Sequence, residues 1–334
     1  QSLLNAPLTP RGLWLIGLGR EAGGDQSGAR DALKAAEKLS RREGAVQMWL
    51  ASDALKRSDV SPGLRHFDII LRTNPKAAQE ILPRLSMAVL APEGRAALKP
   101  YMRADNPWMS HFLLVAADRL PRAEPLGILL SERGVSLPDT PMARRAYSVI
   151  VGRLAEENSY DVFRRVYPRL PGAEAASMKG LGLQQLATSG GGYAPAIWDF
   201  GTSSDRGGAP VSLDGKSIGL EFFASPGTVG AAGSKLLEQS GNLALHWTVV
   251  DRTINQDASA RWIATCVGTE RAGASTSSND LTRLTVGKAL QFRLPANCPV
   301  VRLDFRFAGG TGRQPSNIVI GGLSLVPMER PSGR

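Results

Sequence analysis

The first half of the chain has the spacing of amphipathic helices. Apolar residues recur three and four positions apart, as at Leu33, Ala36 and Leu39, which places them on one face of an α-helix. Helix breakers such as Asn74-Pro75 follow one another at intervals of about 13 to 19 residues, and several of them carry residues that cap helix starts. The pattern predicts about ten antiparallel helices over residues 10–188, with short turns and no strand of four residues or more.

A pair of these helices spans about 32 to 34 residues, a period typical of helical repeat arrays. Residues 12–106 resemble degenerate tetratricopeptide repeats, and the best copy begins at Gly44. The positions of that copy that agree with the family signature are Leu50, Ala51, Gly63, Phe67 and Pro75. Gln47 departs from the signature, because the family has a tryptophan there. The resemblance implies a solenoid of helical hairpins.

Such a solenoid leaves a groove along the first helix of each hairpin, where extended segments of a partner dock. In the copy that begins at Gly44, the first-helix residues expected in the groove are Gln47 and Lys56. They make the expected groove mildly polar and basic, which suits an acidic peptide or chain terminus. The alternative is that the later helices or the second half of the chain fill the groove.

The pattern changes after a glycine-rich segment at residues 189–194, which we expect to be a flexible linker. From Pro195 to Pro327 apolar and polar residues alternate, as they do over residues 300–307. Seven or eight such segments, separated by turns rich in Gly, Ser and Asn, predict an antiparallel β-sandwich. The predicted fold class is α and β in separate domains, which are a helical domain at 1–188, the sandwich at 195–327 and a tail at 328–334.

Three segments of the predicted sandwich resemble the jelly-roll carbohydrate-binding modules: Trp198-Asp199-Phe200, Leu245-His246-Trp247 and Asn317–Leu325. The resemblance implies a jelly roll that contacts sugar, with Trp198 and Asp199 as candidate ligand-binding residues. It also makes Asp199 and Asp304 candidate ligands of a structural calcium ion, for which carboxylate oxygens are suitable. Trp247 and Trp262 share strand faces with apolar residues, so we expect both in the core.

Helical repeats followed by a sandwich, with a Trp262-x-x-x-Cys266 segment and a Pro295-x-x-Cys298 turn, resemble uncharacterised bacterial envelope proteins linked to polysaccharide export. Cys266 and Cys298 are the two cysteines of the chain. Their spacing suits a disulfide between two strands of one sandwich, and the alternative is two separate buried thiols. A disulfide indicates an oxidising compartment.

The start of the chain and its hydropathy bear on the compartment. The chain opens on Gln1 without a Met or a basic segment, which is compatible with a removed leader or anchor. No stretch approaches the roughly 18 consecutive apolar residues of a membrane-spanning helix. We therefore expect a periplasmic or cell-envelope protein without a membrane span in these residues.

A net charge of +10 raises the question of nucleic-acid binding. The excess is spread along the chain, with 26 basic and 19 acidic residues in 1–188 and 14 and 11 in 189–334. No run of Lys or Arg is longer than two, whereas nucleic-acid readers concentrate basic residues and interleave them with aromatics. This distribution disfavours specific nucleic-acid binding and is compatible with diffuse contact with anionic polymers, including acidic polysaccharides.

The sequence contains no Gly-x-Ser-x-Gly elbow, no Walker loop and no His-Glu-x-x-His motif. Residues 17–23 imitate a dinucleotide fingerprint, but a helical pattern follows them instead of a βαβ unit, so we interpret these glycines as contact points between helices. His66, His111 and His246 have no His, Cys or carboxylate at a metal-ligand spacing. No cofactor is expected.

The sequence therefore predicts a non-enzymatic envelope protein. Its helical repeats would hold a protein partner, and its sandwich would contact polysaccharide or protein in exopolysaccharide assembly or export. The alternative is a carbohydrate-active hydrolase or lyase, which needs two carboxylates that converge in space. The carboxylates available to it on the sandwich are Asp199, Asp214, Glu221, Asp251 and Asp304.

Overall fold

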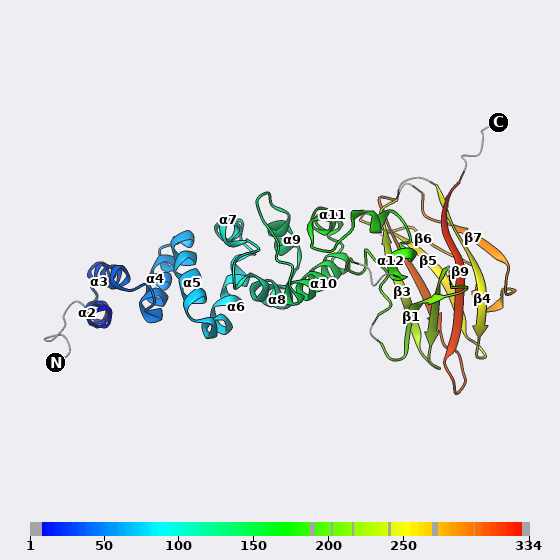
Figure 1. Cartoon of the computed structure of the whole chain (residues 1–334), viewed down its shortest axis with the longest axis horizontal. Coiled ribbons are helices and arrows are strands. Elements are labelled where there is room, and N and C mark those ends of the chain that lie inside the picture. The colour runs from blue at the N-terminus through cyan, green and yellow to red at the C-terminus, as the bar shows by residue number, and fades with distance from the viewer. Residues whose placement is uncertain are drawn as a thin grey trace. The chain divides into compact units, whose positions relative to one another are not determined.

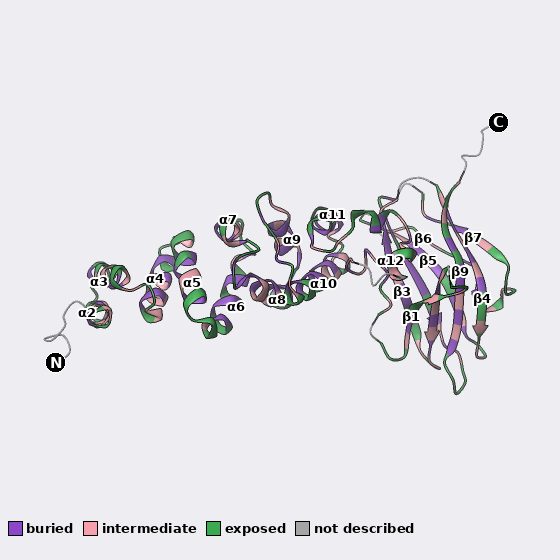
Figure 2. Cartoon of the chain, viewed as in Figure 1, coloured by how far each residue is buried: buried purple, intermediate pink, exposed green. Residues whose placement is uncertain are grey.

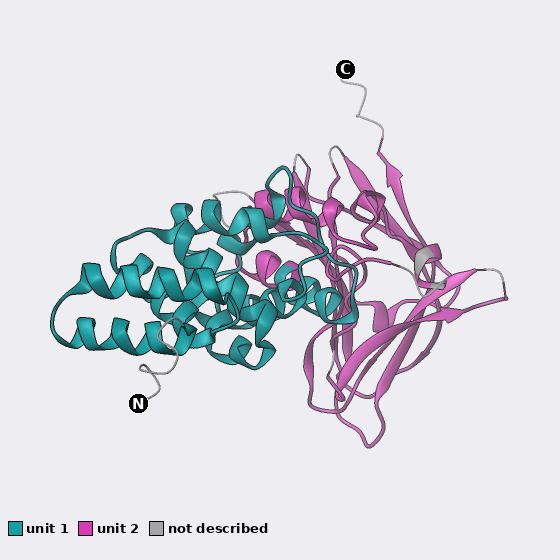
Figure 3. Ribbon diagram, turned by 60° about the vertical axis from the view of Figure 1, so that its left-hand side comes forward, with its two compact units in different colours: residues 1–150 teal, residues 151–334 magenta. Residues whose placement is uncertain are grey.

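The computed structural model describes residues 9–187, 191–201, 203–215, 217–239, 242–268, 273–296 and 298–328 of the chain. It divides into two compact units, residues 1–150 and 151–334 (Figure 3). The division falls inside helix α10 (Pro141–Glu156) and not at the glycine-rich segment 189–194. The last helices of the chain therefore belong to the unit that contains the sheets, and residues 189 and 190 of the predicted linker lie outside the described residues.

The prediction of helices without strands is confirmed over residues 9–187, as far as the structure describes them. Besides α10, the helices are α2 (Pro10–Ala22), α3 (Gln26–Leu39), α4 (Gly44–Lys56), α5 (Val60–Thr73), α6 (Ala78–Ala88), α7 (Pro92–Leu98), α8 (Met109–Arg119), α9 (Glu124–Ser131), α11 (Tyr160–Val166) and α12 (Leu183–Ala187). Within the first unit they follow one another along a row, each with one buried face (Figures 1 and 2). The tetratricopeptide character of this row stays a prediction.

Close approach of the first two helices depends on a glycine. A Cβ atom at Gly17 would lie 2.8 Å from Cγ of Leu33, so the Leu33 side chain of α3 packs directly against the backbone of α2 at this point. Leu33 belongs to a buried cluster with Ala36, Val46 and Leu50 from α3 and α4. The interpretation of the glycines as contact points between helices is confirmed at Gly17, whereas a Cβ atom at Gly19 would meet nothing within 4 Å. α3 follows this segment directly, where a dinucleotide site would need a βαβ unit.

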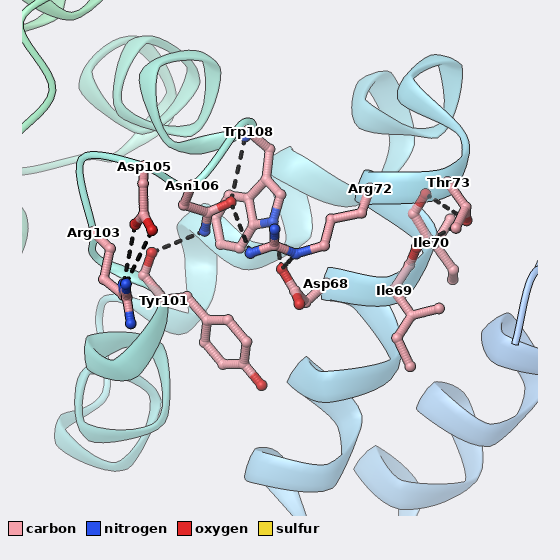
Figure 4. A network of polar contacts seen from close by, with 10 residues as sticks. All are labelled: Asp68, Ile69, Ile70, Arg72, Thr73, Tyr101, Arg103, Asp105, Asn106 and Trp108. Atoms are coloured by element: carbon pink, nitrogen blue, oxygen red, sulfur yellow. Dashed lines mark hydrogen bonds and ion pairs between the residues drawn. The ribbon is translucent and has the colours of Figure 1, made fainter.

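A polar network fastens α5 to the turn before α8 (Figure 4). Asp68 accepts hydrogen bonds from Nε1 of Trp108 and Nε of Arg72, both at 2.8 Å. Asn106 donates to the carbonyl of Tyr101 at 2.8 Å and thereby holds the turn. The helix-breaking residues Asn106 and Pro107 therefore lie in a turn that hydrogen bonds hold in place, and Trp108 after them connects this turn to α5.

The second unit contains two antiparallel sheets that face each other (Figure 1). Their strands are β1 (Arg206–Ser212), β2 (Ile218–Ala224), β3 (Val229–Leu237), β4 (Leu243–Thr253), β5 (Ser259–Val267), β6 (Ser275–Ser277), β7 (Ala289–Arg293), β8 (Val300–Ala308) and β9 (Ser316–Pro327). One sheet has five strands in the order β1-β2-β9-β4-β7, and the other has four in the order β3-β8-β5-β6. Apart from β1, this is the strand order of a jelly roll, in which two Greek keys are wound together. The predicted sandwich class is confirmed.

Aromatic rings fill the space between the two sheets. Phe305 of β8 stacks on Phe222 of β2 at 4.0 Å between ring centroids, and meets Trp262 of β5 edge-on at 4.7 Å. Trp247 and Trp262 are buried, as their strand patterns predicted. Cys266 and Cys298 form the predicted disulfide, with their Cα atoms 5.6 Å apart, which ties the end of β5 to the residues before β8.

Candidate binding surfaces

The first candidate surface is a pocket of about 370 Å³ on α2 and α4. Its wall includes the side chains of Trp14, Met48, Trp49 and Lys56. Nε1 of Trp49 donates to Glu21 of α2 at 2.6 Å, which fixes the ring orientation between the two helices. Because α2 and α4 are the first helices of their hairpins, the pocket lies on the face where a groove was expected.

The structure separates the two residues predicted for that groove. Lys56 is exposed and lines the pocket, whereas Gln47 is fully buried. The placement of Gln47 in an open groove is therefore wrong. Its Oε1 lies 2.6 Å from Nδ1 of His66 on α5, so the glutamine has an internal polar partner where the family signature has a tryptophan. Burial lowers the pKa of His66, which favours the neutral ring inside this pair.

A second pocket, of about 640 Å³, lies on α6, α8 and α10. Its polar lining comes from Gln79, His111, Asp118, Arg119 and Arg145. These helices belong to the region where the repeat signature is lost, so the sequence pointed to none of these residues as part of a pocket. His111 has no His, Cys or carboxylate at a metal-ligand spacing in the sequence, so its sequence neighbours gave no signal for this site.

The candidate sugar-binding residue Trp198 lies in the core. Its side chain is 4 % exposed, its Nε1 donates to the carbonyl of Leu181 at 2.8 Å, and its ring stacks on Phe200 at 6.1 Å. A sugar stacks on the open face of an aromatic ring, and Trp198 has none to offer. The assignment of Trp198 to ligand binding is therefore corrected. The sequence could not show this burial, because Leu181 belongs to the helical segment before the sandwich.

The two calcium candidates lie on either side of Ser234 in β3. Asp199 is exposed and pairs with Ser234 through an isolated backbone bridge, while Asp304 accepts a hydrogen bond from the Ser234 hydroxyl at 2.7 Å. Asp304 also pairs with Nε of Arg302 at 3.0 Å. Within the described ranges, no group of three or more His, Cys, Asp or Glu residues could hold a metal ion. The carboxylate of Asp304 is thus already satisfied by partners of the protein itself.

The carboxylates available to the enzyme alternative lie on both sheets. Glu221 of β2 and Asp251 of β4 each lie opposite Val319 of β9, so they share one face of the five-stranded sheet with one strand between them, whereas Asp304 belongs to the four-stranded sheet. Glu221 accepts a hydrogen bond from the side chain of Asn317. A glycosidase pair needs its two carboxylates on one cleft. Glu221 and Asp304 do not provide that arrangement, and Glu221 and Asp251 are the pair that shares a face.

Lys235 of β3 is a fully buried lysine that the sequence analysis missed. Its Nζ donates to the carbonyl oxygens of Ser177 at 3.0 Å and Ala196 at 2.6 Å. Burial lowers the pKa of this ammonium group to about 7, although the two carbonyl oxygens act in the opposite direction. The lysine thereby fastens the short helical turn at residues 175–179 and the entry segment of the sandwich to β3.

Polar side chains form a strip across the outer face of the five-stranded sheet. His246 of β4 pairs directly with Gln291 of β7 on one side and Ser324 of β9 on the other. Gln291 and Ser324 are exposed and His246 is half-buried. Ser324 also borders an open pocket of about 530 Å³ whose polar lining includes Lys179, Gln184 and Gln239. We call Gln291, His246 and Ser324 the polar strip.

Comparison with known proteins finds similar solved structures and gives no assignment. No protein-family model and no curated protein matches this chain. A carbohydrate-binding module from a study of promiscuous specificity in the β-sandwich superfamily is 10 % identical, with a TM-score of 0.27, over 37 % of this chain and 54 % of that chain. This chain thus spans about half of that first structure.

Two further modules match at a similar level. TmCBM61, solved in complex with β-1,4-galactotriose, is 11 % identical, with a TM-score of 0.26, over 39 % of this chain and 88 % of that chain. The family 30 module of a cellulosomal cellulase of Clostridium thermocellum is 9 % identical, with a TM-score of 0.26, over 39 % and 86 %. Values this low carry no argument about ligand or activity, so the function below is argued from this chain's own residues.

Proposed function

We propose that this protein is a non-enzymatic binding protein of the cell envelope whose jelly roll contacts a polysaccharide. The observation that carries the proposal is the polar strip, which runs across three neighbouring strands and ends at Ser324 beside an open pocket with both polar and apolar lining residues. An amide, an imidazole and a hydroxyl supply both donors and acceptors of hydrogen bonds, as the hydroxyl groups of sugars require.

The disulfide supports the envelope location, and the composition of the strip favours binding over catalysis. The disulfide between Cys266 and Cys298 fits an oxidising compartment. None of the described helices is both long and apolar enough to span a bilayer. The strip itself has no carboxylate among its three residues. Binding without bond cleavage is therefore the activity that these side chains support, with exopolysaccharide assembly or export as the process it would serve.

The test is glycan binding by the full chain on an array of neutral and acidic polysaccharides. Gln291→Ala combined with Ser324→Ala removes two hydrogen-bonding groups, so we expect the Kd for a bound neutral glycan to rise about ten-fold. Ser275→Ala combined with Ser277→Ala on β6 of the other sheet is the matched control and should leave the Kd within about two-fold. Equal effects of the two double variants, or release of reducing sugar from the bound glycan, contradict the proposal.

A second function, capture of a protein partner, is supported by the pocket of Trp14, Trp49 and Lys56 on the first helices. Lys56 is exposed there and has no ion pair among the residues that the structure describes. An acidic peptide segment is the occupant that we propose. Lys56→Glu should abolish retention of a Glu-rich probe peptide, whereas Lys34→Glu on α3 should not. Equal retention by both variants contradicts this placement.

A further inference from the structure

Three arginines line up on the outer face of the four-stranded sheet. Arg306 of β8 pairs directly with Arg261 of β5 on one side and with Ala231 of β3 on the other. Arg206 comes from β1, an edge strand of the five-stranded sheet, and its Nε donates to the carbonyl of Ala231 on β3 at 3.3 Å. We call Arg206, Arg306 and Arg261 the arginine row.

The positive charge of this row is not balanced by the protein. Arg261 and Arg306 are exposed, and within the described ranges no carboxylate lies within 4.0 Å of any of the three guanidinium groups. The next outward residue along β8 is Asp304, but its oxygens accept from Arg302 and from Ser234. Asp304, two residues from Arg306 on β8, therefore already has other hydrogen-bond partners.

The arrangement is unfavourable for the isolated fold. Like charges that lie directly opposite each other on neighbouring strands destabilise a sheet, and Arg306 and Arg261 are such a pair. The backbone also makes room for Arg206, because a Cβ atom at Gly230 would lie 2.7 Å from its Nε. The other outward residues along β5 are Ile263 and Thr265, so packing does not explain why this face carries guanidinium groups.

We propose that the arginine row binds the carboxylate groups of an acidic, uronate-containing polysaccharide. The planar guanidinium group holds a carboxylate through two parallel hydrogen bonds, and three such groups side by side can hold successive charges of one polymer. This inference rests on the proposed polysaccharide function, but it uses the sheet face opposite to the polar strip and names the chemical class of the ligand.

Nucleic acid is the competing polyanion, and the surroundings of the row disfavour it. Proteins that bind single strands combine basic residues with aromatic side chains on which bases stack. The outward residues beside the row are Ala231, Ile263, Thr265 and Ser234, none of which has a ring.

The experiment measures binding of the full chain to polygalacturonate, to a neutral galactan and to a single-stranded oligonucleotide by affinity electrophoresis at several salt concentrations. Arg261→Gln combined with Arg306→Gln should weaken binding to polygalacturonate at least ten-fold and flatten its salt dependence. Arg41→Gln combined with Arg42→Gln removes the same charge from exposed residues of the first unit and should change binding less than two-fold.

The three polymers separate the possible failures. If galactan binding depends on the polar strip but polygalacturonate binding responds equally to both arginine pairs, the arginine row is overturned and the proposed function stands. If no polysaccharide of either class binds, the proposed function itself fails. An oligonucleotide that binds more tightly than polygalacturonate, and is lost with Arg261 and Arg306, assigns the row to nucleic acid and overturns the inference.

Discussion

The helical unit and the jelly roll are each stabilised by a different kind of internal contact. The helices of the first unit bury aliphatic residues such as Ala36 and Leu50. Side-chain hydrogen bonds to Asp53 and Asp68 connect one helix to another. The jelly roll buries stacked aromatic rings and closes them with a disulfide. The polar strip and the arginine row lie on its outer faces.

This difference predicts where single substitutions do most damage. Deletion of a buried ring leaves a cavity that the two sheets cannot close, whereas loss of one polar contact between helices removes a local interaction. The substitutions below are ordered from the largest expected effect on stability to the smallest. A different measured order would contradict the comparison between the two units.

Phe305→Ala should cause the largest loss. The ring is fully buried between Phe222 and Trp262, and removal of a core phenylalanine costs about 3–5 kcal/mol. Urea unfolding followed by tryptophan fluorescence measures it. Phe223→Ala is the matched control, because Phe223 is half-buried on the outer face of β2 and should cost less than half as much. Equal losses would mean that the stacked rings do not dominate the core.

Removal of the disulfide should come next. Cys266 and Cys298 are 32 positions apart, and the chain-entropy model gives about 3–4 kcal/mol for a loop of this length. Cys266→Ser combined with Cys298→Ser should lower the unfolding free energy by that amount, and reduction of the unaltered protein should reproduce the loss. Alkylation and mass spectrometry of oxidised protein should find no free thiol. Two free thiols would contradict the bridge.

Lys235 should make the stability of the jelly roll depend on pH. Its pKa is lowered to about 7 by burial, from an ordinary value of 10.5. Between these two values the unfolded chain binds more protons than the folded chain, so the unfolding free energy should rise as the pH rises from 7 to 10.5. We expect a total rise of a few kcal/mol, since each unit of pKa shift corresponds to about 1.4 kcal/mol.

Lys235→Met is the variant that isolates this contribution. It keeps a long apolar stem and removes the titrating group, so the rise over the same pH window should disappear. Urea unfolding at pH 6.5, 8.5 and 10 measures both proteins, conditions chosen to bracket the lowered pKa of about 7. The same rise in the methionine variant would show that other groups cause it.

Periodicity predicted the order of the elements and the side of each strand that faces the core. Trp247 and Trp262 were placed correctly because alternation within one strand is a local property. Trp198 was not, since it precedes the first strand and is covered by Leu181 from an earlier segment. Local patterns cannot report which distant segment covers a residue.

Contacts between residues that are distant in sequence determine which polar side chains are exposed and which lie side by side. Gln47 looked free because it is polar at a first-helix position, yet it is fully buried and its Oε1 lies 2.6 Å from Nδ1 of His66 on the next helix. The arginine row depends on the register between β5 and β8, whose residues Arg261 and Arg306 meet only in the folded sheet. The alternation of Arg302, Asp304 and Arg306 showed an outward face, but not that Asp304 is occupied by other groups.

Asp53→Asn should cause the smallest of these losses, and in the helical unit. Asp53 of α4 accepts from Nε and Nη2 of Arg30 at 2.7 and 2.8 Å, and from Nε of Arg57 at 3.2 Å. The hydrogen bonds from Arg30, more than the charge of Arg57, hold the pKa of this carboxyl below its usual value of 3.8. The asparagine keeps the shape and loses the charge, so we expect a loss of about 1–2 kcal/mol at neutral pH.

The pH dependence distinguishes this contact from a packing effect. Because the folded pKa is lowered, the stabilisation is complete above the ordinary value of 3.8 and is lost as the pH falls through the lowered one. The difference in unfolding free energy between Asp53→Asn and the unaltered chain should therefore shrink in acid, below about pH 4. Circular dichroism at the helical band during urea unfolding measures both. A difference that stays constant down to pH 2 would assign the loss to packing, and the helical unit would then depend on its buried faces as the jelly roll does.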